Sequence, residues 1–199
     1  MRDEVRADAL LASLEEEHKG KLKVFLGAAP GVGKTYAMLQ AVREQAKEGV
    51  DILIGVVETH GRQETLALLD KLAIQPRKLH HHRQQRLEEM DLDGLLERKP
   101  AIVVVDELAH TNAPGSRHEK RWQDVEELLG AGIDVYSTLN VQHLESLNDI
   151  VGGITGIRVR ETVPDRVFDG ADEVVLVDLT PDDLRQRLKE GKVYLAGQA

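Results

Sequence analysis

The residues best suited to chemistry in this chain form a glycine-rich loop at positions 27–35, with the sequence GAAPGVGKT. Gly31 and Gly33 allow the backbone to turn so that its N–H groups face inward around phosphate oxygens. The start of the following helix adds the positive end of its dipole, and Lys34 adds a point charge for the outer phosphates. Thr35 is expected to be a magnesium ligand. The loop therefore predicts binding of a magnesium-bound nucleoside triphosphate.

The sequence on either side of the loop supports this interpretation. An apolar run at 22–26 precedes it and predicts a buried strand, and a helical pattern follows over 35–47. The strict pattern has glycine where Ala28 stands, with the extra glycine displaced to Gly27, and we expect this small residue to need only minor adjustment. The alternative is a chance glycine-rich turn, which the strand-loop-helix context disfavours.

Two acidic residues follow the most strand-like segment, the aliphatic run at 101–105. Asp106 is expected to hold magnesium together with Thr35, and Glu107 is a candidate base that orients an attacking nucleophile. Glu58, after another predicted strand, is a second candidate base or a partner contact. The alternative for Asp106 is a helix cap, and for Glu58 a polar turn. The expected nucleotide contacts are Ala29, Pro30, Gly31, Val32, Gly33, Lys34, Thr35, Tyr36 and Asp106.

Two further polar segments, each after a predicted strand, are candidates for contacts with the nucleotide. Residues 58–62 (ETHGR) follow a predicted strand and offer Arg62 as a phosphate contact. Residues 138–143 (TLNVQH) end another strand and are candidates for sensing the terminal phosphate, whereas a helix N-cap at Asn140 is the plainer alternative. Each segment is therefore a candidate wall of the same site.

The loop at 110–118 is too polar for a core and is a candidate nucleotide-dependent switch. Arg117 or Arg121 is a candidate arginine finger, and ordinary solvated arginines are the alternative. The triplet His80-His81-His82 raises the question of a metal site, but adjacent strand residues point to opposite faces, so a polar edge strand is the better interpretation.

Strand and helix patterns alternate along the chain and predict an α/β fold of the P-loop NTPase type. Such a fold has a mostly parallel sheet with helices on both faces, and its ligand sites lie at the carboxyl ends of the strands. Strands are expected at 22–26, 52–57, 101–105, 133–138 and 173–177. Helices are expected at 35–47, 63–72, 87–98, 119–129, 141–150 and 181–190, and 77–84 is expected to be a polar strand or an irregular crossing.

Composition narrows the class of protein. The 199 residues fit one domain, predicted at 21–199, after a helical arm at 1–20. A formal charge of -9 argues against a general nucleic-acid surface, and the absence of cysteine excludes disulfides and zinc-thiolate sites. No apolar run approaches the roughly 20 residues that span a bilayer, and the charged start does not resemble a signal peptide. We therefore expect a cytoplasmic domain.

The motifs together resemble the cytoplasmic N-terminal domain of the Kdp-type osmosensitive potassium-channel sensor histidine kinases. The segments that carry this resemblance are 27–39 (GAAPGVGKTYAML), 57–62 (VETHGR), 104–118 (VVDELAHTNAPGSRH), 120–129 (KRWQDVEELL), 132–136 (GIDVY) and 140–149 (NVQHLESLND). The resemblance implies ATP binding at Lys34, Thr35 and Asp106 in a two-component kinase, anchored in the inner (plasma) membrane, that controls potassium uptake. Its implied partners are the remaining kinase domains, a response regulator or a potassium-uptake complex, and a homodimer is possible.

Three functions follow as hypotheses. The leading one is a regulatory domain whose Mg-ATP occupancy changes the loops after Glu58 and Asp106. The second is a phosphotransferase that moves the terminal phosphate to a protein serine or another acceptor, with Glu58 or Glu107 as base. The third is a non-catalytic interaction domain that the nucleotide only stabilises. The resemblance does not make His60, His110 or His143 the phosphorylated histidine of the kinase.

Overall fold

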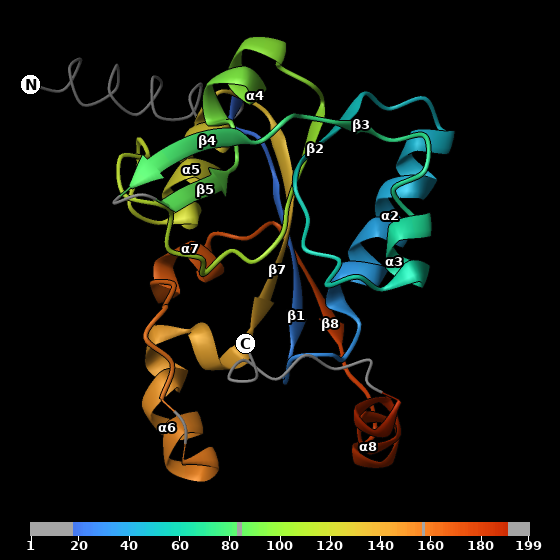
Figure 1. Cartoon of the computed structure of the whole chain (residues 1–199), viewed down its shortest axis with the longest axis vertical. Helices are drawn as coiled ribbons and strands as arrows, with labels where there is room; N and C mark the ends of the chain where they lie inside the picture. Colours follow the sequence, from blue (N-terminus) through green and yellow to red (C-terminus); the bar gives the residue numbers. More distant parts are fainter. Residues whose placement is uncertain (1–17, 83–84, 157, 191–199) are drawn as a thin grey trace, which may run out of the picture.

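A six-stranded parallel sheet forms the centre of the molecule in the computed structural model, which describes residues 18–82, 85–156 and 158–190 (Figure 1). Every pair of neighbouring strands in it runs parallel. The strands, in spatial order, are β3 (Ala73–Ile74), β2 (Ile52–Val56), β6 (Ile102–Val105), β7 (Asp134–Asn140), β1 (Leu22–Gly27) and β8 (Glu173–Val177). The predicted α/β class and the parallel sheet are confirmed.

Helices cover both faces of the sheet, because consecutive side chains of the buried strands point in opposite directions. In β6, Ile102 and Val104 pack in the core beneath α2, whereas Val103 and Val105 pack in the core beneath α5. All four are at most 4% exposed. One side carries α2 (Lys34–Lys47) and α3 (Gln63–Ala67); the other carries α4 (Leu92–Arg98), α5 (Arg121–Gly130) and α7 (Asp165–Asp169) (Figure 1).

The register of the sheet brings the ends of its central strands together. Gly27 at the end of β1 pairs with Asn140 at the end of β7, and Val105 at the end of β6 pairs with Ser137. Because all these strands are parallel, the loops that follow them leave the sheet at the same edge. The predicted site residues of the chain's first three quarters therefore share one edge. The remaining helical elements are η1 (Val141–His143), α6 (Glu145–Thr155) and α8 (Pro181–Lys189).

The predicted helix over 87–98 is wrong in its first turn. The chain there forms β5 (Gln85–Glu89), which pairs antiparallel with β4 (Lys78–His82) in a separate two-stranded sheet, and α4 begins only at Leu92. Cross-strand pairing with β4 satisfies the backbone here, and single-sequence periodicity carries no information about that partner. The polar strand expected at 77–84 is confirmed for β4, while 83–84 lie outside the described residues.

Other boundaries also shift. The helix expected over 63–72 ends at Ala67, and the helix expected over 141–150 divides into η1 and α6. Both β3 and α7, which were not predicted, are short elements with little periodicity of their own. The expected Thr180 cap is confirmed, because its Oγ1 accepts a hydrogen bond from the Asp183 N–H at 3.2 Å. Residues 1–17 of the predicted arm lie outside the described residues, so the arm stays a prediction.

The core beneath α5 gives a first prediction. Leu128→Ala should lower the free energy of unfolding by about 2–5 kcal/mol, because the Leu128 side chain is fully buried and its removal leaves a cavity. Leu79→Ala is the matched control, since Leu79 is 54% exposed on β4 and its truncation should cost about 0.5 kcal/mol or less. Urea unfolding followed by circular dichroism measures both. Equal losses in the two variants would contradict this assignment of the core.

Candidate functional site

The glycine-rich loop turns tightly between β1 and α2. Gly31 and Gly33 have φ angles of 86° and 102°, a region in which side chains with a Cβ are strained. At Gly27 a Cβ would lie 2.6 Å from a Val32 methyl carbon, so the loop folds back too closely for any larger residue. This close approach explains the glycine at Gly27, whereas Ala28, one position further along, is exposed.

Lys34 begins α2 and reaches back across this loop. Its Nζ donates a hydrogen bond to the Ala29 carbonyl at 3.2 Å. Burial lowers the pKa of Lys34 to about 8, although the nearby carboxylates of Asp106 and Glu107 favour its charged form. The ammonium therefore stands in a partly desolvated position where an additional anion would interact with it strongly.

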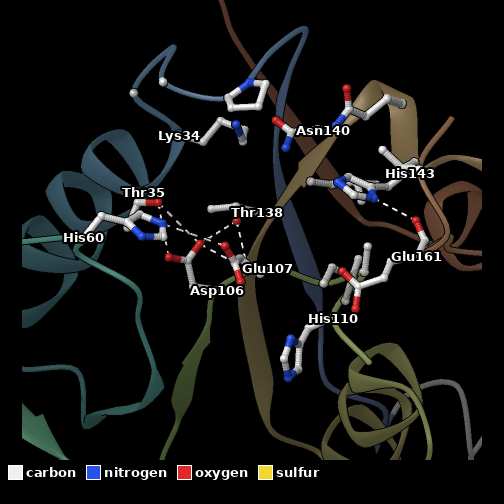
Figure 2. A pocket seen from close by; sticks show the side chains of 18 of the residues that line it. Lys34, Thr35, His60, Asp106, Glu107, His110, Thr138, Asn140, His143 and Glu161 are labelled. Atoms are coloured by element: carbon white, nitrogen blue, oxygen red, sulfur yellow. Dashed lines mark hydrogen bonds and ion pairs between the residues drawn. The ribbon is translucent and has the colours of Figure 1, made fainter. Parts of the chain in front are cut away.

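The Asp106 carboxylate joins the loops at this edge of the sheet (Figure 2). It accepts hydrogen bonds from the hydroxyls of Thr35 at 3.2 Å and Thr138 at 2.5 Å. It also accepts backbone N–H bonds from Glu58 and Glu107, each at 3.1 Å. The residue is 1% exposed, so its charge is stabilised by these four donors and not by bulk water. One side chain thus fixes α2, β7 and the loops after β2 and β6.

Glu107 and His60 face each other above this carboxylate (Figure 2). Both have left-handed backbones, with φ angles of 57° and 50°, which side chains with a Cβ rarely adopt. His60 Nε2 lies 3.9 Å from Glu107 Oε1. Partial burial, followed by the charge of Asp106, raises the pKa of Glu107. A carboxyl group held beside a cavity with a raised pKa has the properties of an acid–base group.

Glu58 is placed differently from Glu107. Its backbone N–H bonds to Asp106, but its carboxylate forms an ion pair with Arg77 at 2.8 Å. This ion pair turns the Glu58 carboxylate towards Arg77, at the start of the β4–β5 hairpin. Tyr36 is 37% exposed, and Val32 is 3% exposed with its side chain packed against the loop. Backbone groups of Val32, and not its side chain, are therefore the ones available to a ligand.

A cavity of about 450 Å³ extends from the glycine-rich loop to the opposite wall of the site (Figure 2). Of the residues predicted for nucleotide, metal or acid–base contacts, the structure brings together at this cavity Pro30, Gly31, Gly33, Lys34, Thr35, Asp106 and Glu107. His60 and Arg62 also line it, as do Thr138 and Asn140. The four segments that the sequence presented as separate candidates thus contribute to one site, apart from the Glu58 carboxylate.

The far wall of the cavity, to which Val159, Arg160 and Glu161 contribute, was not predicted from the sequence. His143 Nδ1 is 2.7 Å from the Glu161 carbonyl, which can only accept, so Nδ1 carries the proton. Glu161 Oε1 accepts the Thr111 N–H at 2.8 Å. Only a polar run at 158–161 after a helix end marked this segment in the sequence.

Asn140 does not cap the helical turn that follows it. The η1 turn has no side-chain cap bond from Asn140, and the buried Asn140 Oδ1 has no hydrogen-bond partner among the residues that the structure describes. A buried polar atom without a partner is uncommon in native proteins and marks either a functional contact or a strained site. The capping interpretation is therefore wrong, and because Asn140 lines the cavity the phosphate-sensing interpretation of residues 138–143 stays a prediction.

A buried ion pair between Arg121 and Glu89 lies against the backbone of the Asp106–Glu107 segment. Arg121 donates to the Asp106 carbonyl at 3.0 Å and pairs with Glu89 at 3.3 Å. Glu89 also accepts from His110 Nε2 at 3.1 Å and from the Ala113 N–H at 2.8 Å. Arg121 is only 3% exposed, so the arginine-finger interpretation is wrong for this residue: its guanidinium is held inside its own chain. Arg117 pairs with Asp93 and Glu127 instead.

The site is suited to a metal ion only in combination with a ligand. Among residues 18–82, 85–156 and 158–190, no group of three or more histidine, aspartate or glutamate side chains is placed to hold a metal ion. Magnesium in nucleotide sites uses one or two protein oxygens together with phosphate oxygens and water. The Thr35 hydroxyl and the Asp106 carboxylate, 3.2 Å apart, match that requirement.

Within the part of the chain described here, no helix has the length and apolarity to cross a bilayer.

The Glu89–Arg121 pair generates a second prediction. Arg121→Met should lower the free energy of unfolding by about 3–5 kcal/mol, because it leaves Glu89 buried without its cation. Adding Glu89→Leu to this variant should restore part of the loss, since no uncompensated charge then remains. Thermal unfolding of the single and double variants measures both effects. A double variant that is less stable than Arg121→Met alone would contradict the assigned pairing.

Comparison with known proteins identifies the family. The family model for the osmosensitive K+ channel His kinase sensor domain matches residues 18–199. The chain is 65% identical over 192 residues to the sensor protein KdpD of Escherichia coli (strain K12), an alignment that covers 96% of this chain and 22% of that protein. It is 54% identical to the sensor protein KdpD of Clostridium acetobutylicum, with 93% of this chain and 21% of the relative covered.

A putative sensor protein KdpD of Synechocystis is also 54% identical, over 92% of this chain and 50% of the relative. The chain therefore spans about a fifth to a half of the length of these relatives. The expected resemblance is confirmed over nearly the whole described region, including the loop, the Asp106 segment and the far wall of the cavity. This chain belongs to the family of osmosensitive K+ channel histidine kinase sensor domains.

Proposed function

We propose that this chain is an ATP-binding regulatory domain on the cytoplasmic side of a membrane-anchored two-component histidine kinase that controls potassium uptake. Mg-ATP would occupy the cavity, with its phosphates in the loop at 27–35, which acts as a P-loop. The observation that carries the proposal is the Asp106 carboxylate, which lies 3.2 Å from the Thr35 hydroxyl at the end of that loop. The remaining domains of the kinase would then be the partners that respond.

The chain's own groups divide the work of binding. The backbone N–H groups around Gly31 and Gly33 and the start of α2 would hold the phosphates, and Lys34 would neutralise the outer ones. Thr35 and Asp106 would hold magnesium between them. Bound ATP would supply a phosphoanhydride bond and several negative charges. Asn140 lines the cavity, and its Nδ2 hydrogens would donate to oxygens of the terminal phosphate.

The same geometry suggests how occupancy would be transmitted. The Thr35 hydroxyl donates a hydrogen bond to the Asp106 carboxylate. If these two residues held a magnesium ion, their oxygens would bind the ion in place of this hydrogen bond. The N–H groups of Glu58 and Glu107 bond to that same carboxylate, so the loops after β2 and β6 would adjust with it. Mg-ATP would thereby bias two loops towards one arrangement, which is the requirement for a regulatory domain.

Phosphotransfer to a hydroxyl acceptor is the second candidate function. The raised pKa of Glu107 and its place beside the cavity favour this activity. The cavity also continues past Glu107 to His143 and Glu161, the side from which an acceptor would approach (Figure 2). Glu107 is better placed than Glu58 to act as base, because the Glu58 carboxylate is paired with Arg77. Release of ADP coupled to phosphate on an acceptor separates this function from a purely regulatory one.

The loop lysine gives the direct test of ATP binding. Lys34→Ala should weaken binding of Mg-ATP by on the order of 10-fold or more, because it removes a charged donor from a desolvated site. Lys47→Ala is the matched control, since Lys47 lies on the same helix and pairs with Glu44 at an exposed position. Calorimetric titration measures both, with circular dichroism as a check of the fold. Unchanged affinity in Lys34→Ala would reject the loop as the phosphate site.

Magnesium dependence tests the metal ligands. Thr35→Val should abolish most of the gain in ATP affinity that magnesium provides, whereas Thr35→Ser keeps the hydroxyl and should retain it. Asp106→Asn should also lose this gain, and it should destabilise the fold because an amide nitrogen cannot accept the hydrogen bonds that a carboxylate oxygen accepts. Titrations with and without magnesium measure the ratio of affinities. The same ratio in Thr35→Val and Thr35→Ser would contradict the assignment.

A further inference from the structure

The last helix of the described region lies beside the glycine-rich loop. β8 pairs with β1 over five residue pairs, and the final pair joins Val177 to Gly27, the first residue of that loop. Only residues 178–180 then separate β8 from α8. The parallel pairing therefore delivers α8 to the edge of the sheet at which the loop begins (Figure 1).

The start of α8 is well defined by local hydrogen bonds. Thr180 Oγ1 accepts the Asp183 N–H at 3.2 Å and donates to the Asp183 carboxylate at 2.7 Å. The Leu184 N–H bonds to the Thr180 carbonyl at 3.0 Å, which closes the first turn. A capped first turn fixes the direction in which the helix leaves the sheet. It also fixes which side chains of the next turn face the loop.

Arg187 is the α8 side chain that reaches the loop. Its Nη1 donates to the Gly31 carbonyl at 3.3 Å, across 156 residues of sequence. The same nitrogen lies 3.5 Å from the position that a Cβ on Gly33 would occupy. The guanidinium is therefore bonded to Gly31 and lies beside Gly33, the two glycines that shape the loop. A Cβ at Gly33 would be in ordinary van der Waals contact with it.

The partners of Arg187 differ from those of its neighbour. Arg185 pairs with Asp182 on the exposed side of α8. Arg187 forms no ion pair with a carboxylate of the described residues, although the chain has 35 acidic residues against 26 lysines and arginines. Lys34 behaves in the same way, since its ammonium donates to a loop carbonyl, that of Ala29. Two cations thus converge on the loop from different elements.

We propose that Arg187 is a further binding residue for the nucleotide, contacting its phosphates from α8. This inference rests on the proposed function of the loop as a phosphate site. A guanidinium has five N–H donors, so Arg187 can keep a bond to the Gly31 carbonyl and also donate to a phosphate oxygen. Binding would then fasten α8 to the loop, and the position of this helix would report the presence of the nucleotide. The rival explanation is that Arg187 only tethers α8 to the folded domain.

The test compares Arg187→Ala with Arg185→Ala in calorimetric titrations with ATP plus magnesium. Loss of one charged hydrogen bond predicts about 10-fold weaker binding for Arg187→Ala. Arg185→Ala, which removes the same charge from the exposed side of the helix, should change the affinity less than about 2-fold. Arg187→Lys should fall between the wild type and Arg187→Ala, because a point charge replaces the fork of donors. Hydrogen exchange of α8 should slow on addition of Mg-ATP in the wild type and not in Arg187→Ala.

Each other outcome overturns the inference. Equal affinities for Arg187→Ala and Arg185→Ala, with a lower melting temperature only in Arg187→Ala, would show a tether and no ligand contact. If Lys34→Ala loses binding and Arg187→Ala does not, the P-loop assignment stands and the Arg187 contact is rejected. If the wild type binds no Mg-ATP, both the proposed function and this inference fail. If Arg187→Ala loses binding but its circular dichroism spectrum is also altered, Arg187→Lys decides between the two explanations. Wild-type affinity in Arg187→Lys would reject the contact between the guanidinium and the phosphates.

Discussion

The arrangement of the site depends on one buried charge, the carboxylate of Asp106. Removing a carboxylate from water is costly unless its oxygens are hydrogen-bonded, and Asp106 is 1% exposed. Four donors meet this requirement, and they come from α2, β7 and the loops after β2 and β6. None of these segments can move without leaving part of the charge unsatisfied. The carboxylate therefore sets the relative positions of groups that lie up to 103 residues apart in sequence, from Thr35 to Thr138.

Strain in the backbone lies next to the same carboxylate. The Glu107 N–H donates to the Asp106 carboxylate, and Glu107 itself, where the chain turns after β6, has a φ of 57°. Arg121 holds the other side of this peptide by donating to the Asp106 carbonyl, and its charge is balanced by Glu89. A strained residue persists only when the surrounding structure over-determines it, and here both ends of the peptide are bonded. The β4–β5 hairpin, which carries Glu89, is thereby coupled to the cavity.

Much of this fold was predictable because its central features are local in sequence. Local patterns predict two strands from the apolar runs at 22–26 and 101–105, and the start of a helix from the GKT sequence at 33–35. None of these predictions depends on distant residues. What the sequence did not reveal are the long-range partners. The Glu89–Arg121 pair joins a hairpin to a helix, and the hydrogen bond from His143 to the Glu161 carbonyl helps to hold the far wall against the segment after β7. No pattern within either segment specifies such a pairing, so the two predicted alternatives for Arg121, an arginine finger and a solvated side chain, did not include its buried ion pair.

The charges at the cavity also bear on how an acidic protein would hold a polyanion. Asp106 and Glu107 stand at the end where the terminal phosphates would lie, and Lys34 alone does not outweigh two carboxylates together with several phosphate charges. Positive charge is therefore needed beside the terminal phosphates. A divalent cation beside Thr35 and Asp106 would supply two positive charges in a small volume. Backbone N–H groups of the loop would serve the other end, where Arg187 would add a second cation to Lys34. Within the proposed function, the overall charge of -9 and phosphate binding are compatible because positive potential is needed only locally.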